Sequence, residues 1–268
     1  MLIARLLAFV RRDLINATSY KAAFAYQIGT LFSSIFTVYF LSRMVTGGTV
    51  PSLDAYGGDY FSFAIIGVAL ADYLTVSLNG FSQAIRMAQV LGTLEAMLAT
   101  PTSPSLIVVG SAMYRFLWSF VRVGLYLLAG LLLGAQFGDV QVGALLLTLL
   151  LCLIAFGAVG IIGASLILVL KAWNPMVAIF SGLSMLLGGV LYPVTTMPDA
   201  AQLGAQALPL TYALEAMRGA LLMGKGVGEL AQPLAVLAGF AVVLLPIALV
   251  AFQLAVRYLR KEGSVAHY

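Results

Sequence analysis

Long apolar segments, separated by short polar ones, recur along the whole chain. Six of them read as helices that cross a bilayer, at 22–41, 60–81, 106–133, 140–170, 176–192 and 234–256. A helix needs roughly 20 apolar residues to cross the hydrocarbon core. The pattern therefore predicts an all-α integral membrane protein with six transmembrane helices, in a single transmembrane domain over residues 1–268.

The residues ahead of the first span show helical periodicity with two different faces. Apolar side chains recur on one face and polar ones on the other, namely Ile3, Leu7, Val10 and Leu14 against Arg5, Arg12 and Asn16. A helix of this kind lies in the membrane interface instead of spanning it. We expect an N-terminal interfacial amphipathic helix within residues 1–20, and a plain basic flank of the first span is the alternative.

Prolines divide the moderately apolar segment that follows the fifth span. Pro193, Pro198 and Pro209 leave pieces that are too short to cross a bilayer. Non-helical backbone at membrane depth is tolerated only where protein or water satisfies it. We therefore expect residues 194–223 to form a broken hairpin between spans five and six, which is re-entrant or, alternatively, interfacial.

Charge decides the orientation of these spans. Of the residues, 62% are hydrophobic and only 9% are charged, whereas soluble domains contain roughly a quarter charged residues. The side of the termini carries Arg5, Arg11, Arg12, Lys21, Arg86, Lys171, Arg257, Arg260 and Lys261, and the opposite side Arg43, Arg218 and Lys225. By the positive-inside rule both termini are cytoplasmic and the hairpin is extracellular. The net charge of +4 thus reflects membrane topology, and no nucleic-acid partner is expected.

The sequence offers no catalytic or metal motif. The nearest approach to a phosphate-binding loop is Gly224-Lys225-Gly226, which lacks the hydroxyl residue after lysine and the strand before it. The acidic residues on the hairpin side are scattered over several loops and form no pair. We therefore expect that the chain is not itself an enzyme.

A more polar segment over residues 84–104 separates the second and third spans. Met87, Leu91, Leu94 and Leu98 share one helical face, Arg86, Gln89 and Thr93 lie on the other, and Glu95 is at the boundary. The periodicity predicts a short amphipathic helix from Arg86 that ends at Thr100-Pro101. Periodicity alone leaves open whether its polar face binds a partner or only connects two spans.

Two charged residues fall inside predicted spans. Asp72 is in the middle of the second span and Arg122 in the middle of the third, at similar depth. Intramembrane charges are costly and are normally paired or turned toward water. We expect an Asp72–Arg122 ion pair, which serves either to join two helices or to contact substrate along its path.

Five short strings occur in a fixed order within this six-span frame. They are Gly92–Pro101 (GTLEAMLATP), Asn174-Pro175, Gly188–Pro193 (GGVLYP) followed by Met197-Pro198, and Leu208–Arg218 (LPLTYALEAMR). Together they resemble permease subunits of the type-2 ABC exporter family, and the resemblance covers essentially the whole chain. The loop is more similar to drug, antibiotic and lipo-oligosaccharide exporters than to the polysaccharide branch.

The resemblance implies both partners and roles. It implies two cytoplasmic ABC ATPase subunits that bind ATP and Mg, no cofactor in this chain, and a second permease subunit, with a homodimer expected before a heterodimer. It assigns ATPase coupling to Gly92–Leu98. Together with the amphipathic helix around this string, we expect the coupling residues to be Arg86, Gln89, Gly92, Thr93, Leu94, Glu95, Leu98 and Pro101. The resemblance assigns the outer hairpin to Pro193, Pro198, Pro209, Tyr212, Glu215 and Arg218.

The expected function is export of a hydrophobic or amphipathic substrate across the cell (inner) membrane, with lipid around a multi-pass subunit. Alternating access would be driven by the separate ATPase. The alternative is an ATP-independent secondary transporter or channel that uses Asp72 and Arg122.

Overall fold

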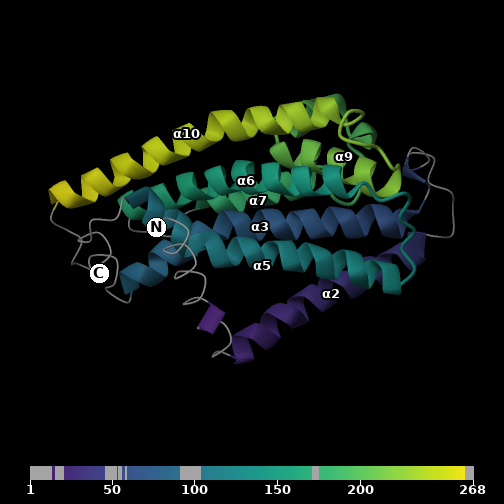
Figure 1. Cartoon of the computed structure of the whole chain (residues 1–268), viewed down its shortest axis with the longest axis horizontal. Helices are drawn as coiled ribbons and strands as arrows, with labels where there is room; N and C mark the ends of the chain where they lie inside the picture. Colours follow the sequence, from purple (N-terminus) through teal and green to yellow (C-terminus); the bar gives the residue numbers. More distant parts are fainter. Residues whose placement is uncertain are drawn as a thin grey trace.

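The computed structural model describes residues 14–15, 21–45, 53, 56–57, 59–90, 104–170 and 175–262. Within these ranges the long elements are all helical (Figure 1): α2 (Lys21–Val45), α3 (Tyr60–Val90), α5 (Pro104–Leu132), α6 (Val142–Leu170), α7 (Pro175–Leu187), η2 (Val194–Thr196), α8 (Asp199–Gln206), α9 (Pro209–Leu222) and α10 (Ala231–Glu262). Apart from Leu14 and Ile15, the expected interfacial helix at residues 1–20 lies outside the described part.

Five of the described helices are long and apolar enough to cross a membrane, namely α2, α3, α5, α6 and α10. They confirm an all-α membrane protein. The predicted fifth span is different, because α7 has only 13 residues and is about 20 Å long. It ends at Leu187, where Gly188 and Gly189 follow and Gly189 takes a positive φ of 81°. The sixth crossing therefore stays a prediction.

Helices α3 and α6 form the centre of the bundle. Of the most apolar part of α3, 72% is buried inside the protein, against 22% for both α2 and α10. The backbones of α3 and α6 come close at Gly160, where a Cβ atom would lie 2.8 Å from the Ser77 carbonyl oxygen. Only glycine allows this approach, which is typical of helix packing in membranes.

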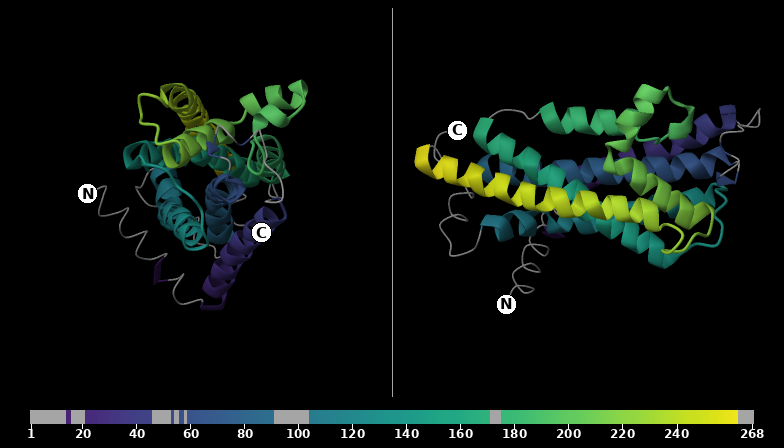
Figure 2. Two further views of the ribbon diagram at one scale, coloured as in Figure 1. Left: turned by 90° about the vertical axis from the view of Figure 1, so that its right-hand side faces the viewer. Right: turned by 90° about the horizontal axis from the view of Figure 1, so that it is seen from above.

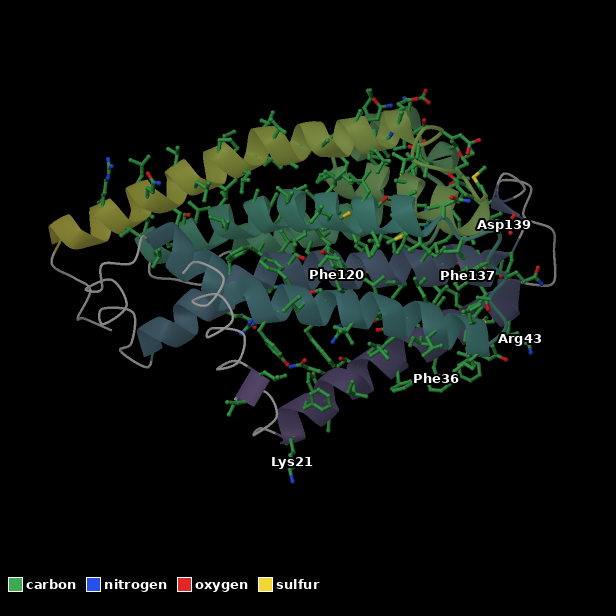
Figure 3. The ribbon with its side chains drawn as sticks, in the orientation of Figure 1. Lys21, Phe36, Arg43, Phe120, Phe137 and Asp139 are labelled. Carbon is green, nitrogen blue, oxygen red and sulfur yellow. The ribbon has the colours of Figure 1, made fainter. Side chains whose placement is uncertain are left out.

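Helix α2 lies at the edge and contacts α3 and α5. It buries one stripe at helical spacing, Leu31, Ile35, Val38 and Ser42. Its other faces carry exposed aromatic side chains, and Figure 3 shows Phe36 on the side turned away from the bundle. An apolar surface of this kind suits lipid or another membrane helix.

The two ends of the bundle differ in what they carry. Arg43 and Asp139 lie at one end with α8 and α9, and we call this the hairpin end (Figures 1 to 3). The start of α2, labelled at Lys21, and the end of α10 lie toward the opposite end, which we call the Lys21 end. The chain therefore enters and leaves the described bundle on the same side.

The boundary between the second span and the polar segment after it differs from the prediction. Instead of a break before a separate helix from Arg86, α3 continues through Val90. The sequence between Phe81 and Val90 contains neither proline nor glycine, so nothing in it stops a helix. The rest of the predicted amphipathic helix, from residue 91, lies outside the described residues.

The segment between α7 and α10 is broken as the prolines predict. Pro193 and Pro198 immediately precede η2 and α8, and Pro209 is the first residue of α9. Proline suits these positions because it fixes φ and lacks the N–H that would be unsatisfied there. Whether this broken segment re-enters the membrane stays a prediction.

A glycine exchange tests the α3–α6 contact. We expect Gly160→Ala to lower the free energy of unfolding by about 1–3 kcal/mol, because the new methyl group forces two backbones apart. Gly239→Ala on α10 is the control, since no atom lies within 4 Å of the Cβ position there. The stabilities of both variants are measured by thermal unfolding in detergent. Equal stabilities would contradict the close α3–α6 contact.

Candidate functional site

The two charges inside the bundle form a bidentate ion pair. Arg122 Nε donates to Asp72 Oδ2 at 2.7 Å, and Nη2 donates to Oδ1 at 2.6 Å. The side chain of Arg122 is 8% exposed and that of Asp72 is 20% exposed. The pair therefore joins α3 to α5 and leaves one edge of the carboxylate accessible. Two parallel, charge-assisted hydrogen bonds make it geometrically specific.

A buried tyrosine lies beside the pair. Tyr126, one turn after Arg122 on α5, is 1% exposed, and its side chain lies near Asp72, Arg122 and Ser34 of α2. The Ser34 hydroxyl donates to the Thr30 carbonyl oxygen of its own helix at 3.0 Å. Sequence reasoning found the two charges but missed Tyr126, because tyrosine is not unusual in a membrane helix.

Asp72 also begins a polar stripe along α3. Asp72, Thr75, Asn79 and Gln83 follow one another at helical spacing, and none of them is buried. Next to this stripe, the Thr75 hydroxyl lies 3.4 Å from that of Ser181 on α7. Near the Lys21 end, Arg115 of α5 donates to the Gln83 side-chain oxygen. We call Asp72, Thr75, Asn79 and Gln83 the polar stripe.

Arg218, expected in the outer hairpin, is buried in the protein and only 3% exposed. Its guanidinium donates to the carbonyl oxygens of Gly189 at 2.9 Å, Val190 at 2.8 Å and Phe63 at 3.2 Å. Its Cζ atom lies 3.4 Å from the centre of the Phe63 ring. The charge count treated Arg218 as a membrane-flanking cation, and its burial removes it from that group.

The other predicted hairpin residues shape the segment locally. The Tyr212 hydroxyl donates to the Gln206 carbonyl oxygen at 3.1 Å, which ties α9 to the end of α8. Pro193 and Pro209 are buried, whereas Pro198 and Glu215 are exposed. These residues do not converge on Asp72 and Arg122, so the hairpin and the ion pair are separate features.

The predicted coupling residues cannot be placed in the same way. Arg86 and Gln89 lie in the last turns of α3, where only the backbone is described. Gly92, Thr93, Leu94, Glu95, Leu98 and Pro101 lie outside the described residues. The described helices α3 and α5 lead into and out of this segment, at Val90 and Pro104.

Neutralising the ion pair tests its contribution to the fold. We expect Asp72→Asn and Arg122→Gln alone each to lower the free energy of unfolding by about 3–5 kcal/mol, because each leaves an uncompensated buried charge. The double variant should recover most of this loss. Unfolding in detergent measures all three, and a double variant less stable than either single one would contradict the pairing.

A comparison with protein families gives a match over residues 4–222 to the family described as "ABC-2 type transporter". Among curated proteins no match is found. The matched region covers most of the chain and includes the polar stripe, the ion pair, the segment between α3 and α5, and the broken segment through α9. The chain therefore belongs to the ABC-2 type transporter family, as the membrane subunit of a transport system and not as a catalyst in its own right.

Proposed function

We propose that this chain is the membrane-spanning subunit of an ATP-driven exporter. It moves a hydrophobic or amphipathic substrate, such as a drug, an antibiotic, a lipid or a lipo-oligosaccharide, out of the cytoplasm or inner leaflet. The family match over residues 4–222 carries this proposal. ATP and Mg are bound by two copies of a separate cytoplasmic ATPase, and two permease subunits, preferably identical, complete the complex.

The connection between α3 and α5 supports coupling to such an ATPase. Both helices are long, with 31 and 29 residues, and the polar segment joins their ends. A push on this segment would therefore act on two spans at once. In this proposal Gly92 lies on the face that meets the ATPase, where a missing side chain permits close approach.

The polar stripe supports a path for substrate along α3. Polar and charged groups in a membrane helix normally face a bundle interior or a water-filled cavity. Thr75 and Gln83 are nevertheless exposed in the single chain. A second copy of the chain that covers this side of α3 would enclose the stripe, and the exposed apolar faces of α2 and α7 offer it contact area.

The charge distribution supports the orientation. Arg43 and Lys225 are the basic residues assigned to the hairpin side once Arg218 is excluded, and nine basic residues are assigned to the other. The hairpin end therefore faces the outside of the cell membrane, and both termini face the cytoplasm. Substrate would leave toward the outer leaflet.

The ion pair argues against the ATP-independent alternative. An ion-coupled secondary transporter needs a group that can take up and release the coupling ion, and Asp72 is the carboxylate that the alternative assigns to this role. Both oxygens of Asp72 already accept hydrogen bonds from Arg122. This geometry suits a permanent link between helices better than an ion-coupling site.

Co-purification tests the ATPase partnership. Mild detergent extraction of the chain from its own host should bring down an ABC ATPase, and an adjacent ATPase reading frame is expected. Gly92→Trp should weaken this binding about tenfold or more, because an indole ring fills the docking surface. Gly239→Trp, in open space on α10, is the control. Absence of an ATPase, with transport unaffected by Gly92→Trp, would overturn the proposal.

Cysteine labelling tests whether the polar stripe meets water. Cys152 is the chain's one cysteine and is buried, so a Cys152→Ala background is free of thiols. In the assembled complex, Thr75→Cys should react with a water-soluble maleimide, since a hydrated thiolate is the nucleophile that attacks the reagent. Val243→Cys, on the exposed apolar face of α10, should not react. Equal rates at both positions would contradict a water-lined path.

A further inference from the structure

Arg218 holds together three segments that are far apart in the sequence. It belongs to α9. Among the described residues no carboxylate pairs with its guanidinium, which donates to main-chain oxygens instead. Two of these oxygens, on Gly189 and Val190, follow the end of α7, and the third, on Phe63, is in the first turn of α3. One side chain thus ties α9 to both α7 and α3.

The carbonyl groups around Arg218 compensate its charge. A guanidinium is protonated under all physiological conditions, and burying it without partners would be very costly. The oxygens just beyond α7 lie where a helix presents its negative end. The Phe63 ring adds its negative face, with Cζ 3.4 Å from its centre. Within the described part of the chain, the cation is therefore stabilised by carbonyl groups and an aromatic ring instead of by an acidic residue.

The backbone around Arg218 is built to allow this contact. A Cβ atom on Gly67 of α3 would lie 2.0 Å from the Val190 carbonyl oxygen and 2.9 Å from Arg218 Nη2. Gly189 has a φ of 81°, which a glycine adopts readily and other residues rarely do. Gly67 thus makes room for the guanidinium, and Gly189 forms the turn whose carbonyl groups accept its hydrogen bonds.

The far end of α9 is also held. The Gly138 and Gln141 amides, from the turn between α5 and α6, donate to the Leu221 and Ala220 carbonyl oxygens at 2.9 Å and 3.0 Å. These bonds satisfy carbonyl groups at a helix end that would otherwise be unpaired. With Arg218 in its middle turns, α9 is fixed to the bundle at both positions.

Helix α3 connects this clamp to the opposite end of the bundle. It runs without interruption from Tyr60 to Val90, which is about 46 Å. Phe63 is in its first turn, and Val90 adjoins the segment for which ATPase coupling is proposed. A displacement of α3 at its Lys21 end therefore reaches Phe63 and, through Arg218, the ends of α7 and α9.

We propose that Arg218 is a positioning residue that makes the outer hairpin move with α3, so that ATP-driven displacement of α3 moves the hairpin. This inference rests on the proposed function, because it needs an ATPase to displace α3. Its specific content is that the link is the guanidinium contact with the Phe63, Gly189 and Val190 carbonyl groups. Weakening that contact should separate ATP hydrolysis from hairpin movement.

The test uses the complete complex of this chain with its ATPase, reconstituted in lipid nanodiscs. Leu203 on α8 is 68% exposed, so Leu203→Cys in the Cys152→Ala background can carry an environment-sensitive fluorophore. The ATP-dependent fluorescence change reports hairpin movement, and phosphate release reports hydrolysis. Three changes weaken the clamp in different ways: Arg218→Lys removes the planar fork, Gly67→Ala displaces the Val190 carbonyl, and Phe63→Leu removes the ring.

We expect hydrolysis to persist in all three variants, while the ATP-dependent fluorescence change falls about tenfold in Arg218→Lys and Gly67→Ala and less in Phe63→Leu. Gly124→Ala on α5, where no atom lies within 4 Å of the Cβ position, should behave as the parent. If Arg218→Lys and Gly67→Ala fail to accumulate, the fluorescence change of Phe63→Leu alone tests the proposal.

Other outcomes separate the two levels of the proposal. A parent-like fluorescence response in Arg218→Lys and Phe63→Leu would overturn the role of Arg218. The role of Arg218 would also be overturned if the parent complex transported substrate while the fluorescence of its labelled hairpin did not respond to ATP. If no ATPase binds the unmodified chain, the proposed function itself fails. That outcome is seen in the binding experiment, without any measurement of hairpin movement.

Discussion

Every main-chain polar group that is buried away from water must find a partner within the protein, and this constraint organises the whole bundle. The long helices meet it through their own hydrogen bonds. Between α7 and α10 the chain is broken into short helices, so the constraint has to be met by other groups. Arg218 supplies donors to carbonyl oxygens just beyond α7, and amides of the α5–α6 turn supply donors to the end of α9. The broken segment is therefore ordered by the same rule that makes the spans helical.

Arg122 and Arg218, the two buried cations among the described residues, are stabilised in different ways. Arg122 is paired with a carboxylate on the neighbouring helix, so the pair is neutral and its contacts are between side chains. Arg218 is surrounded by carbonyl dipoles and an aromatic ring, so its positive charge remains. The first arrangement fixes α3 beside α5 within the bundle. The second fixes α3 beside the hairpin near one end, and α3 is common to both.

Hydropathy and proline positions were enough to predict most of the helices. Apolar runs located α2, α3, α5, α6 and α10, and the three prolines located the breaks before η2, α8 and α9. Three features were not predicted from hydropathy and proline positions. Helix α3 continues to Val90 because no breaker intervenes, which hydropathy does not report. Helix α7 ends early because the Gly188-Gly189 turn competes with an apolar continuation. Arg218 resembles a flanking charge until the carbonyl groups of distant segments are seen around it.

The separation of Asp72 and Arg122 along the chain has a consequence for biosynthesis. The two residues are 50 positions apart, so α3 leaves the ribosome before its counter-charge has been made. An unpaired aspartate at the centre of a helix costs about 2.5–3.5 kcal/mol during insertion. That cost falls once α5 arrives, which favours release of α3 and α5 into lipid together as a helical hairpin. The ion pair of the finished protein thus also sets the order in which its helices can leave the insertion machinery.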